Sequence, residues 1–443
     1  MSNTNKQNGR IIAIVTCMFL YAMIAFVTNL AAPVGNVWKN QEGINGSNML
    51  GMMGNMMNFL AYLFMGIPAG KMLKTKGYKT TALIGIAVGF VGVFIQFVSG
   101  FGNMGQMFGL PTAFFVYLLG AFVSGFSVCL LNTVVNPMLN VIGGGGNRGN
   151  QLNLVGGTLN SLAGTLTPML VGLLVGAVTK ATVMSDINMV LYIAMGVFAA
   201  AFVALIFIPI ENPSNTSSEA KLEHTPWAFR HCVLGIIGIF FYVGIEIGIP
   251  GTLNFYLTDP DKGAFHALNL YASNAAVIAG FVAASYWLLM LVGRMVGSFI
   301  GGKVSSRAML ASTTAGAIVL IVIAMILPMN NTVLMPVFTG STFELATVPM
   351  SALLFVLCGL CTSIMWSSIF NLSIEGLGKY TESASGIFMM MVVGGGIMPL
   401  IQNAVADKFG FMLSYIVPIL SLVYLFFYAI IGSKNVNKDI PVE

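Results

Sequence analysis

The sequence predicts an all-α membrane protein whose twelve transmembrane helices form two pseudo-symmetric six-helix halves. Of its 443 residues, 57% are hydrophobic and 7% are charged, whereas roughly a quarter of the residues of a soluble domain are charged. Apolar stretches of roughly 20 residues, the length that crosses a bilayer as a helix, recur along the whole chain. Short polar and glycine patterns of the first half also return in the second half, in the same order.

The first apolar stretch begins at Ile11, after a polar start, and is too long for the core of a signal peptide. We therefore interpret it as the first span. The twelve predicted spans are residues 11–36, 48–70, 80–99, 112–142, 151–178, 187–210, 229–257, 272–302, 307–327, 348–376, 381–404 and 409–432. The longest polar segment follows the sixth span. This order predicts an N-terminal bundle of residues 1–210, a cytoplasmic linker of residues 211–228 and a C-terminal bundle of residues 229–443.

Lys and Arg are divided unequally between the two sides of the predicted spans. Fourteen fall in loops and tails on the side of the termini, and four fall in loops on the other side. Because positively charged loops stay in the cytoplasm, we expect both termini to be cytoplasmic. The formal charge of +5 comes from these short loops and does not indicate nucleic-acid binding.

Three pairs of patterns suggest that the second half repeats the first. They are Asn29/Pro33/Asn36 with Glu246/Pro250/Asn254, Gly125/Asn132 with Gly359/Trp366, and Gly70-Lys71 with Gly302-Lys303. The first pair is offset by 217 residues (29 to 246), and the others by 232 to 234 (70 to 302, 125 to 359). Duplicated halves of this kind pack around a central site in many transporters.

Several motifs resemble enzyme or metal sites, and we reject them. Residues 144–149 satisfy GxGxxG, but they lie between two spans rather than after a strand. Cys358 and Cys361 form a CxxC pair inside an apolar helix without a second pair, and the three histidines lie in or beside loops. We therefore expect no cofactor, no metal, no disulfide framework and no enzyme activity.

The fourth predicted span carries Asn132, Asn136 and Asn140, which repeat every four residues and share one face of a helix. Polar side chains inside a membrane usually line a cavity, because burying them against lipid is unfavourable. The alternative is that these amides only form hydrogen bonds between helices. Three amides on one face favour the cavity.

Charged side chains within the predicted spans are few. Glu246 is the one acidic residue well inside a span, and Arg294 in the eighth span is the one deeply placed cation. A carboxylate in a membrane can bind and release a proton, so Glu246 is our predicted coupling residue with Arg294 as its partner. The alternative is a permanent ion pair that only holds helices together.

Neutral amides and aromatic rings dominate the remaining polar positions near mid-span. This combination suits an uncharged, polyhydroxylated solute such as a sugar, whereas an anion would require several intramembrane cations. The residues predicted to bind the substrate are Asn29, Tyr62, Asn132, Asn136, Asn160, Asn254, Trp366 and Asn371.

Nearly the whole chain resembles the fucose:proton symporter family of the major facilitator superfamily. The resemblance rests on Asn29–Pro33, Ile67–Gly70, Lys76–Lys79, Leu131–Pro137, Leu152–Leu154 with Asn160-Ser161, Phe241–Glu246, Gly293-Arg294, Ser363–Phe370 and Val393–Gly396. It implies the major facilitator fold, alternating access and monosaccharide uptake across the bacterial inner membrane, with substrates such as glucose, galactose or fucose. We also expect a monomer.

Two positions depart from the family pattern. Fucose permeases carry an Asp in the first helix and a Glu in the fourth, where this chain has Asn29 and Asn132. An amide forms hydrogen bonds but does not titrate at physiological pH. Coupling could therefore have moved to Glu246, could use sodium, or could be absent in a sugar uniporter. A non-transporting sugar sensor on the same fold is a further alternative.

Overall fold

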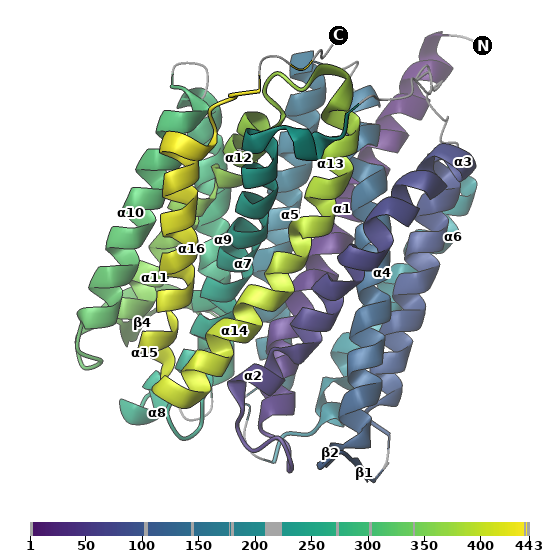
Figure 1. Cartoon of the computed structure of the whole chain (residues 1–443). Helices are drawn as coiled ribbons and strands as arrows, with labels where there is room; N and C mark the ends of the chain where they lie inside the picture. Colours follow the sequence, from purple (N-terminus) through teal and green to yellow (C-terminus); the bar gives the residue numbers. More distant parts are fainter. Residues whose placement is uncertain are drawn as a thin grey trace.

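The computed structural model of the chain is built almost wholly of helices, which confirms the predicted all-α membrane fold (Figure 1). It describes residues 3–101, 105–142, 146–176, 178, 181–208, 224–271, 274–300, 304–339, 342–437 and 440. Twelve helical segments in these ranges are long and apolar enough to cross a membrane. The predicted linker, residues 211–228, lies outside the described residues up to residue 223.

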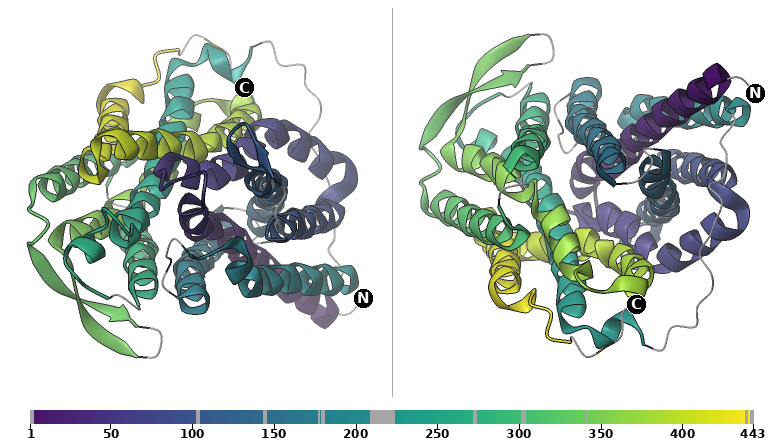
Figure 2. Two further views of the ribbon diagram at one scale, coloured as in Figure 1. Left: turned by 90° about the horizontal axis from the view of Figure 1, so that it is seen from below. Right: turned by 90° about the horizontal axis from the view of Figure 1, so that it is seen from above.

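The first six spans are carried by five helices and the last six by eight. The first group is α1 (Asn3–Lys39), α3 (Met53–Val98), α4 (Thr112–Ile142), α5 (Gly146–Val175) and α6 (Asn188–Phe207). The second group is α7 (Arg230–Thr258), α9 (Ala275–Ile300), α10 (Ser306–Ile326), α11 (Met350–Thr362), α12 (Met365–Ile374), α13 (Thr381–Met390), α14 (Gly394–Phe409) and α16 (Ile416–Phe427). Seen along the helices, the two groups lie on opposite sides of the molecule (Figure 2).

Short elements connect or extend these helices. They are α2 (Asn48–Gly51), α8 (Ala264–Ala267), α15 (Phe411–Ser414), and the turns η1 (Met184–Ile187), η2 (Pro226–Ala228), η3 (Gly378–Tyr380), η4 (Met391–Val393) and η5 (Tyr428–Gly432). Two antiparallel hairpins were not predicted from the sequence: β1 (Gln106–Met107) with β2 (Leu110–Pro111), and β3 (Thr332–Phe338) with β4 (Phe343–Pro349). The two chain termini lie together at the opposite end of the bundle from α2, α8 and the β1–β2 hairpin (Figure 1).

The second and third spans share the label α3 but are two helices separated by a kink, as the sequence predicted. The spans Met53–Leu73 and Thr75–Val98 meet near Gly77, whose φ of 78° turns the chain back. A glycine adopts this left-handed conformation readily because it has no Cβ atom. The two spans were therefore predicted correctly, and the bend falls between their predicted ends at residues 70 and 80.

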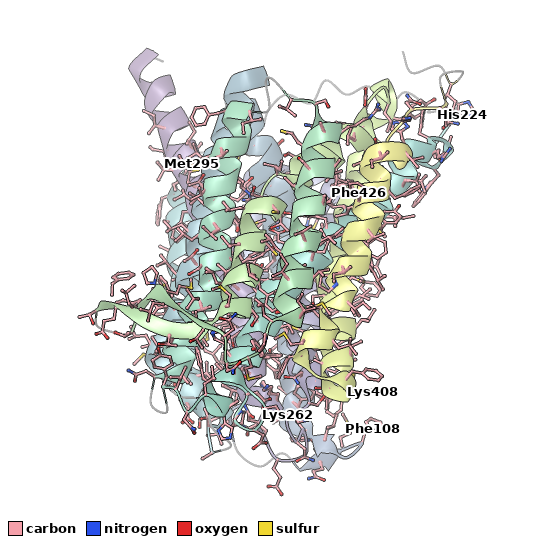
Figure 3. All side chains as sticks on the ribbon, turned by 90° about the vertical axis from the view of Figure 1, so that its left-hand side faces the viewer. Phe108, His224, Lys262, Met295, Lys408 and Phe426 are labelled. Carbon is pink, nitrogen blue, oxygen red and sulfur yellow. The ribbon has the colours of Figure 1, made fainter. Side chains whose placement is uncertain are left out.

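Large apolar side chains cover the flank of the bundle. Phe207 and Phe299 are each 79% exposed and Ile326 is 75% exposed. In Figure 3, Met295 and Phe426 lie along this flank, whereas His224 lies at one end and Lys262 and Lys408 at the other. An apolar belt between two polar ends is the surface that a bilayer requires.

A glycine contact supports the predicted duplication of the two halves. A Cβ atom built on Gly125 of α4 would overlap the carbonyl oxygen of Asn58 on α3. In the second half, a Cβ atom on Gly359 of α11 would overlap the carbonyl oxygen of Tyr286 on α9. The two glycines that the repeat pairs therefore serve the same close approach of two helices.

Candidate functional site

A small central cavity lies between helices of the two halves. Its volume is about 30 Å³, enough for about two water molecules. The helices α1, α3, α5, α7 and α9 contribute its walls, and the lining residues are Thr28, Asn29, Ala32, Pro33, Asn55, Pro168, Ile247, Pro250, Gly251, Asn254, Ala283 and Trp287. Among the residues that the structure describes, the polar members of this lining are neutral and none is charged.

The repeat pattern brings two prolines to the central cavity. Pro33 of α1 and Pro250 of α7 both line it. A proline has no N–H group, so it cannot donate to the carbonyl four residues earlier in its helix. Those carbonyls belong to Asn29 and Glu246. Both halves therefore place a polar residue with a freed backbone acceptor at mid-membrane, where substrate sites of duplicated transporters form.

Two residues predicted to bind the substrate, Asn29 and Asn254, line the central cavity, and Asn55 and Trp287 line it with them. Asn29 donates from Nδ2 to the carbonyl of Ala25 at 2.9 Å, within its own helix. Asn55 donates to the carbonyl of Gly395 at 2.8 Å and so connects α3 to α14. Trp287, next to the buried Tyr286, offers the cavity an indole ring. A tryptophan within the eighth predicted span was the available sequence signal.

Tyr62 and Asn132 contact each other rather than the central cavity. The Asn132 amide donates to the Tyr62 hydroxyl at 2.6 Å, which joins α4 to α3. Tyr62 is 3% exposed, so this contact resembles the interhelical bond that we considered as an alternative. The side chains of Asn136 and Asn140 lie outside the described part of the structure. The polar stripe as a whole thus remains a prediction.

Trp366 belongs to an aromatic cluster in the second half. Its ring packs edge-on against Tyr242 at 6.1 Å and Phe388 at 5.6 Å between centroids. Asn160 is half-buried on α5, and Asn371 on α12 is exposed. None of the residues Trp366, Asn160 and Asn371 lines the central cavity, so a solute that touched them together with Asn29 would need a wider cavity.

Glu246 and Arg294 lie together, as the sequence predicted. The Arg294 guanidinium is 3.7 Å from the Glu246 carboxylate, and the two side chains are 24% and 14% exposed. Direct charge-assisted hydrogen bonds are shorter, roughly 2.7–2.9 Å. Arg294 also donates to the carbonyl of Gly157 and to the hydroxyl of Ser161 on α5, each at 3.2 Å. It thereby connects the second half to the first.

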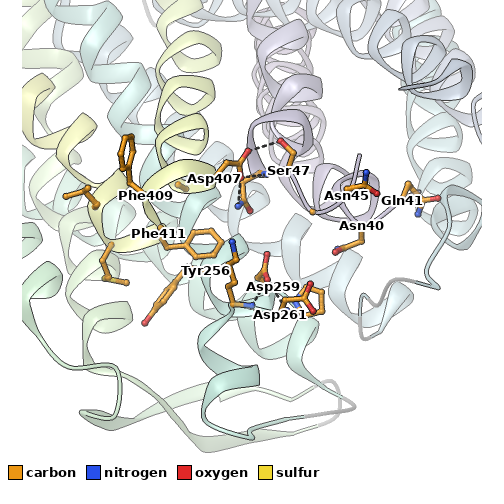
Figure 4. A pocket seen from close by; sticks show the side chains of 18 of the residues that line it. Asn40, Gln41, Asn45, Ser47, Tyr256, Asp259, Asp261, Asp407, Phe409 and Phe411 are labelled. Carbon is orange, nitrogen blue, oxygen red and sulfur yellow. Dashed lines mark hydrogen bonds between the residues drawn. The ribbon is translucent and has the colours of Figure 1, made fainter. Parts of the chain in front are cut away.

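A tighter group of polar contacts joins the halves at the end away from the termini. Lys39, at the end of α1, is completely buried and donates to Asp259 and Asn48 at 2.8 Å each. Asp407 of α14 accepts from the Asn48 backbone at 2.7 Å and from the Ser47 hydroxyl at 2.7 Å. We call Lys39, Asn48, Asp259 and Asp407 the end network; Figure 4 labels its two carboxylates, Asp259 and Asp407.

Asp259 has a shifted pKa within the end network. Burial alone would raise the pKa of this carboxyl, but Lys39 and the backbone N–H groups of Lys262 and Asp261 lower it below its usual value. The two N–H groups donate to one carboxylate oxygen at 2.7 and 3.0 Å. Asp259 therefore stays ionised and holds the buried ammonium of Lys39.

The end network separates the central cavity from a larger hollow. Along α1 the order is cavity residues up to Pro33, then Asn36, which bonds Thr258 at 2.8 Å, then Lys39. Beyond them, a hollow of about 880 Å³ opens among residues 40–48, 256–262 and 406–413 (Figure 4). The protein is thus closed between the central cavity and the end that lies away from the termini.

Sequence reasoning missed the end network because it assigned Lys39 to a loop. The offset between the two repeated halves offered a usable signal. Lys39 and Asp259 are 220 residues apart (39 to 259), close to the offset of 217 that relates Asn29 to Glu246. Two opposite charges at equivalent ends of α1 and α7 could therefore have been paired.

Comparisons with known proteins agree with this architecture. The sequence pattern of the Major Facilitator Superfamily matches residues 14–398. The chain is 30% identical to a glucose/galactose transporter of Brucella abortus, over 98% of this chain and 97% of that protein. It is 22% identical to the L-fucose-proton symporter of Escherichia coli, over 86% of this chain and 84% of that protein.

Solved structures show the same fold. The fucose:proton symporter FucP in its outward conformation matches with a TM-score of 0.62 at 18% identity, over 96% of this chain and 100% of that chain. The nucleoside transporter NupG matches with a TM-score of 0.66 at 14% identity, over the same shares. These findings confirm the predicted resemblance and the predicted fold. The chain belongs to the Major Facilitator Superfamily.

Proposed function

We propose that this protein is a secondary transporter that imports a neutral monosaccharide, a hexose or deoxyhexose such as glucose, galactose or fucose. The observation that carries the proposal is the central cavity, which lies between the halves and is lined by three neutral amides and an indole ring. Amides exchange hydrogen bonds with hydroxyl groups, and an aromatic face packs against the apolar face of a sugar ring. The names of the relatives, two of which are sugar transporters, support the same substrate class.

Transport would proceed by alternating access between the two six-helix bundles, residues 1–210 and 229–443, joined by the linker 211–228. The closed end network supports this mechanism, because it joins α1 and α2 of one bundle to α7 and α14 of the other. Opening this end would break those contacts and widen the central cavity. Asn160, Trp366 and Asn371 could then join Asn29, Asn132, Asn136, Tyr62 and Asn254 around the sugar.

Proton coupling would reside at Glu246. This chain has Asn29 and Asn132 where fucose permeases have acidic residues, so neither position titrates. Glu246 lies beside Arg294, which also bonds α5 in the other half. Protonation of Glu246 would weaken its attraction to Arg294, and Arg294 would keep only its hydrogen bonds to α5. We propose that the protein is a monomer in the bacterial inner membrane. Its termini would be cytoplasmic, because the Lys- and Arg-rich loops lie on the same side of the membrane as the termini.

The test is uptake of labelled glucose, galactose, fucose, mannose and N-acetylglucosamine into proteoliposomes. Each sugar is tested with and without a proton or sodium gradient, for the wild type and Glu246→Gln. We expect proton-driven accumulation of one hexose, lost in Glu246→Gln, with counterflow exchange retained. Downhill flux that ignores both gradients would instead establish a uniporter, which the two amides at positions 29 and 132 favour as the second candidate. Sugar binding without flux would indicate a sensor.

A further inference from the structure

The β3–β4 hairpin between α10 and α11 has no role in the proposed transport cycle. It projects sideways from the second half and lies outside the ring of helices (Figure 2). In the side view it runs across the helices rather than along them (Figure 3). Its seven residue pairs run from Thr332 opposite Pro349 to Phe338 opposite Phe343.

One face of this hairpin packs on the protein. Successive residues of a strand point to opposite faces, and the inner face carries Met335, Val337, Ala346 and Val348, which are at most 8% exposed. Tyr271, before α9, adds a polar attachment. Its hydroxyl accepts from the Thr347 N–H at 2.6 Å and donates to the Thr347 carbonyl at 3.2 Å. The hairpin is therefore fixed in its orientation.

The other face is also apolar, yet it faces away from the protein. It carries Leu334, Pro336, Phe338, Phe343 and Leu345, and of these Leu334 and Leu345 are 60% and 66% exposed. Phe343 is 70% exposed, and its ring also contacts Phe281 of α9 at 5.9 Å between centroids. An exposed apolar strand in water is an aggregation hazard, and contiguous apolar patches mark an interaction surface. Between residues 327 and 349 the sequence contains a single ionisable side chain, Glu344. This composition does not suit a water-facing loop.

The outward face continues the lipid-facing surface of α10. That helix ends at Ile326, which is 75% exposed, and Val322 one turn earlier is 42% exposed. Thr332, the first residue of β3, follows only six positions later. Open strand edges are unfavourable within hydrocarbon, because their N–H and C=O groups find no partner there. At the boundary between acyl chains and headgroups, the apolar face can contact lipid while the polar strand edges form hydrogen bonds with headgroups and water.

We propose that the β3–β4 hairpin is an interfacial anchor that lies flat on the bilayer at the end away from the termini. Leu334 and Leu345 insert between the lipid chains of that leaflet, and the strand-edge groups outside the Tyr271 contact face headgroups and water. The occupant of this face is lipid, rather than a second copy of the chain or a soluble partner. Because the hairpin contacts α9 and α11, it anchors the second half.

The test uses nitroxide labels on single cysteines in a variant whose five native cysteines are replaced by serine or alanine. Leu345→Cys and Leu334→Cys report on the hairpin. Val322→Cys, on α10, is the lipid-facing control, and Lys262→Cys is the water-facing control at the same end. The labelled proteins are reconstituted into vesicles of phosphatidylcholine and phosphatidylglycerol. Collision rates are measured by EPR with oxygen, which concentrates among acyl chains, and with a water-soluble nickel chelate.

We expect the labels at positions 334 and 345 to collide with oxygen as the Val322→Cys control does, and several-fold less with nickel than the Lys262→Cys control. Nickel collision equal to that of the Lys262→Cys control would overturn the anchor. Low collision with both reagents, together with spin–spin broadening between chains, would overturn it in favour of a second copy. A monodisperse elution profile for each variant verifies folding, and the removed side chains are exposed, so folding should persist.

Discussion

Two ion pairs in the described part of the molecule differ in tightness and in what surrounds them. Lys39 and Asp259 are 2.8 Å apart, with side-chain exposures of 0% and 8%. Arg294 and Glu246 are 3.7 Å apart, with exposures of 24% and 14%. Tight, fully satisfied charges resist separation, whereas a loose pair with alternative partners can exchange them. The comparison favours the first pair as a lock on this end and agrees with the proposed coupling role of the second.

Removing Asp259 should have the largest effect. Asp259→Asn leaves the buried Lys39 ammonium without its counter-charge, which typically destabilises by about 3–5 kcal/mol. We expect a lower melting temperature and faster labelling of an Ala32→Cys thiol in the central cavity by a water-soluble maleimide. Lys262→Met removes an exposed cation at the same end and is the matched control. Equal behaviour of the two variants would show that the end network does not hold this end closed.

The second prediction concerns the loose pair. Glu246→Gln should reduce proton-driven accumulation by tenfold or more, about 1.4 kcal/mol of coupling, while melting temperature changes little. Arg294→Lys keeps the charge but loses the planar donor group that reaches both Gly157 and Ser161, so an intermediate loss is expected. If Glu246→Gln instead unfolds the protein as Asp259→Asn does, the pair is structural.

A third prediction separates two aromatic candidates for sugar contact. Trp287→Ala and Trp366→Ala each remove one aromatic surface, and a lost stacking contact weakens binding by about 1–3 kcal/mol. We expect both variants to bind sugar more weakly, measured by calorimetry in detergent. Trp227→Ala, an exposed tryptophan before α7, is the control. Unchanged affinity in a folded Trp366→Ala variant would remove that ring from the site.

The smallest effect is expected from pH. The pKa of Asp259 lies below its usual value, so its stabilising contribution is complete above the unfolded value of about 3.9 and declines as pH falls below it. Melting temperature should therefore show no step from the titration of Asp259 between pH 5 and 8. The difference between wild type and Asp259→Asn should shrink only below about pH 4. A step near neutrality that depends on Asp259 would contradict the locked pair.

The sequence predicted what depends on composition along a single helix. Apolar runs located the twelve spans, and the scarcity of charge within them led directly to Glu246 and Arg294. The repeat led to Gly125 and Gly359. The position of Trp287 beside Asn29, and the burial of Lys39, depend instead on how α1, α5 and α9 tilt against each other. Helix tilt is set by packing across hundreds of residues, and periodicity within one helix does not encode it.

Other differences have equally local causes. Asn371 was chosen because it lies near mid-span, yet it is exposed on α12, which begins at Met365 after α11 ends at Thr362. The β3–β4 hairpin alternates two apolar faces, so no polar period revealed its strands. Tyr62 and Asn132 were predicted as sugar ligands, and in this closed arrangement they bond each other at 2.6 Å.

The glycine contacts of Gly125 and Gly359 also fix the distance between two pairs of helices. Because each helix pair touches backbone to backbone, α3 cannot slide past α4, nor α9 past α11, without a collision of main-chain atoms. Probes placed across either pair should keep one separation through every state of the protein. Such a pair supplies a constant reference distance, against which distance changes between the two halves can be calibrated in the same sample.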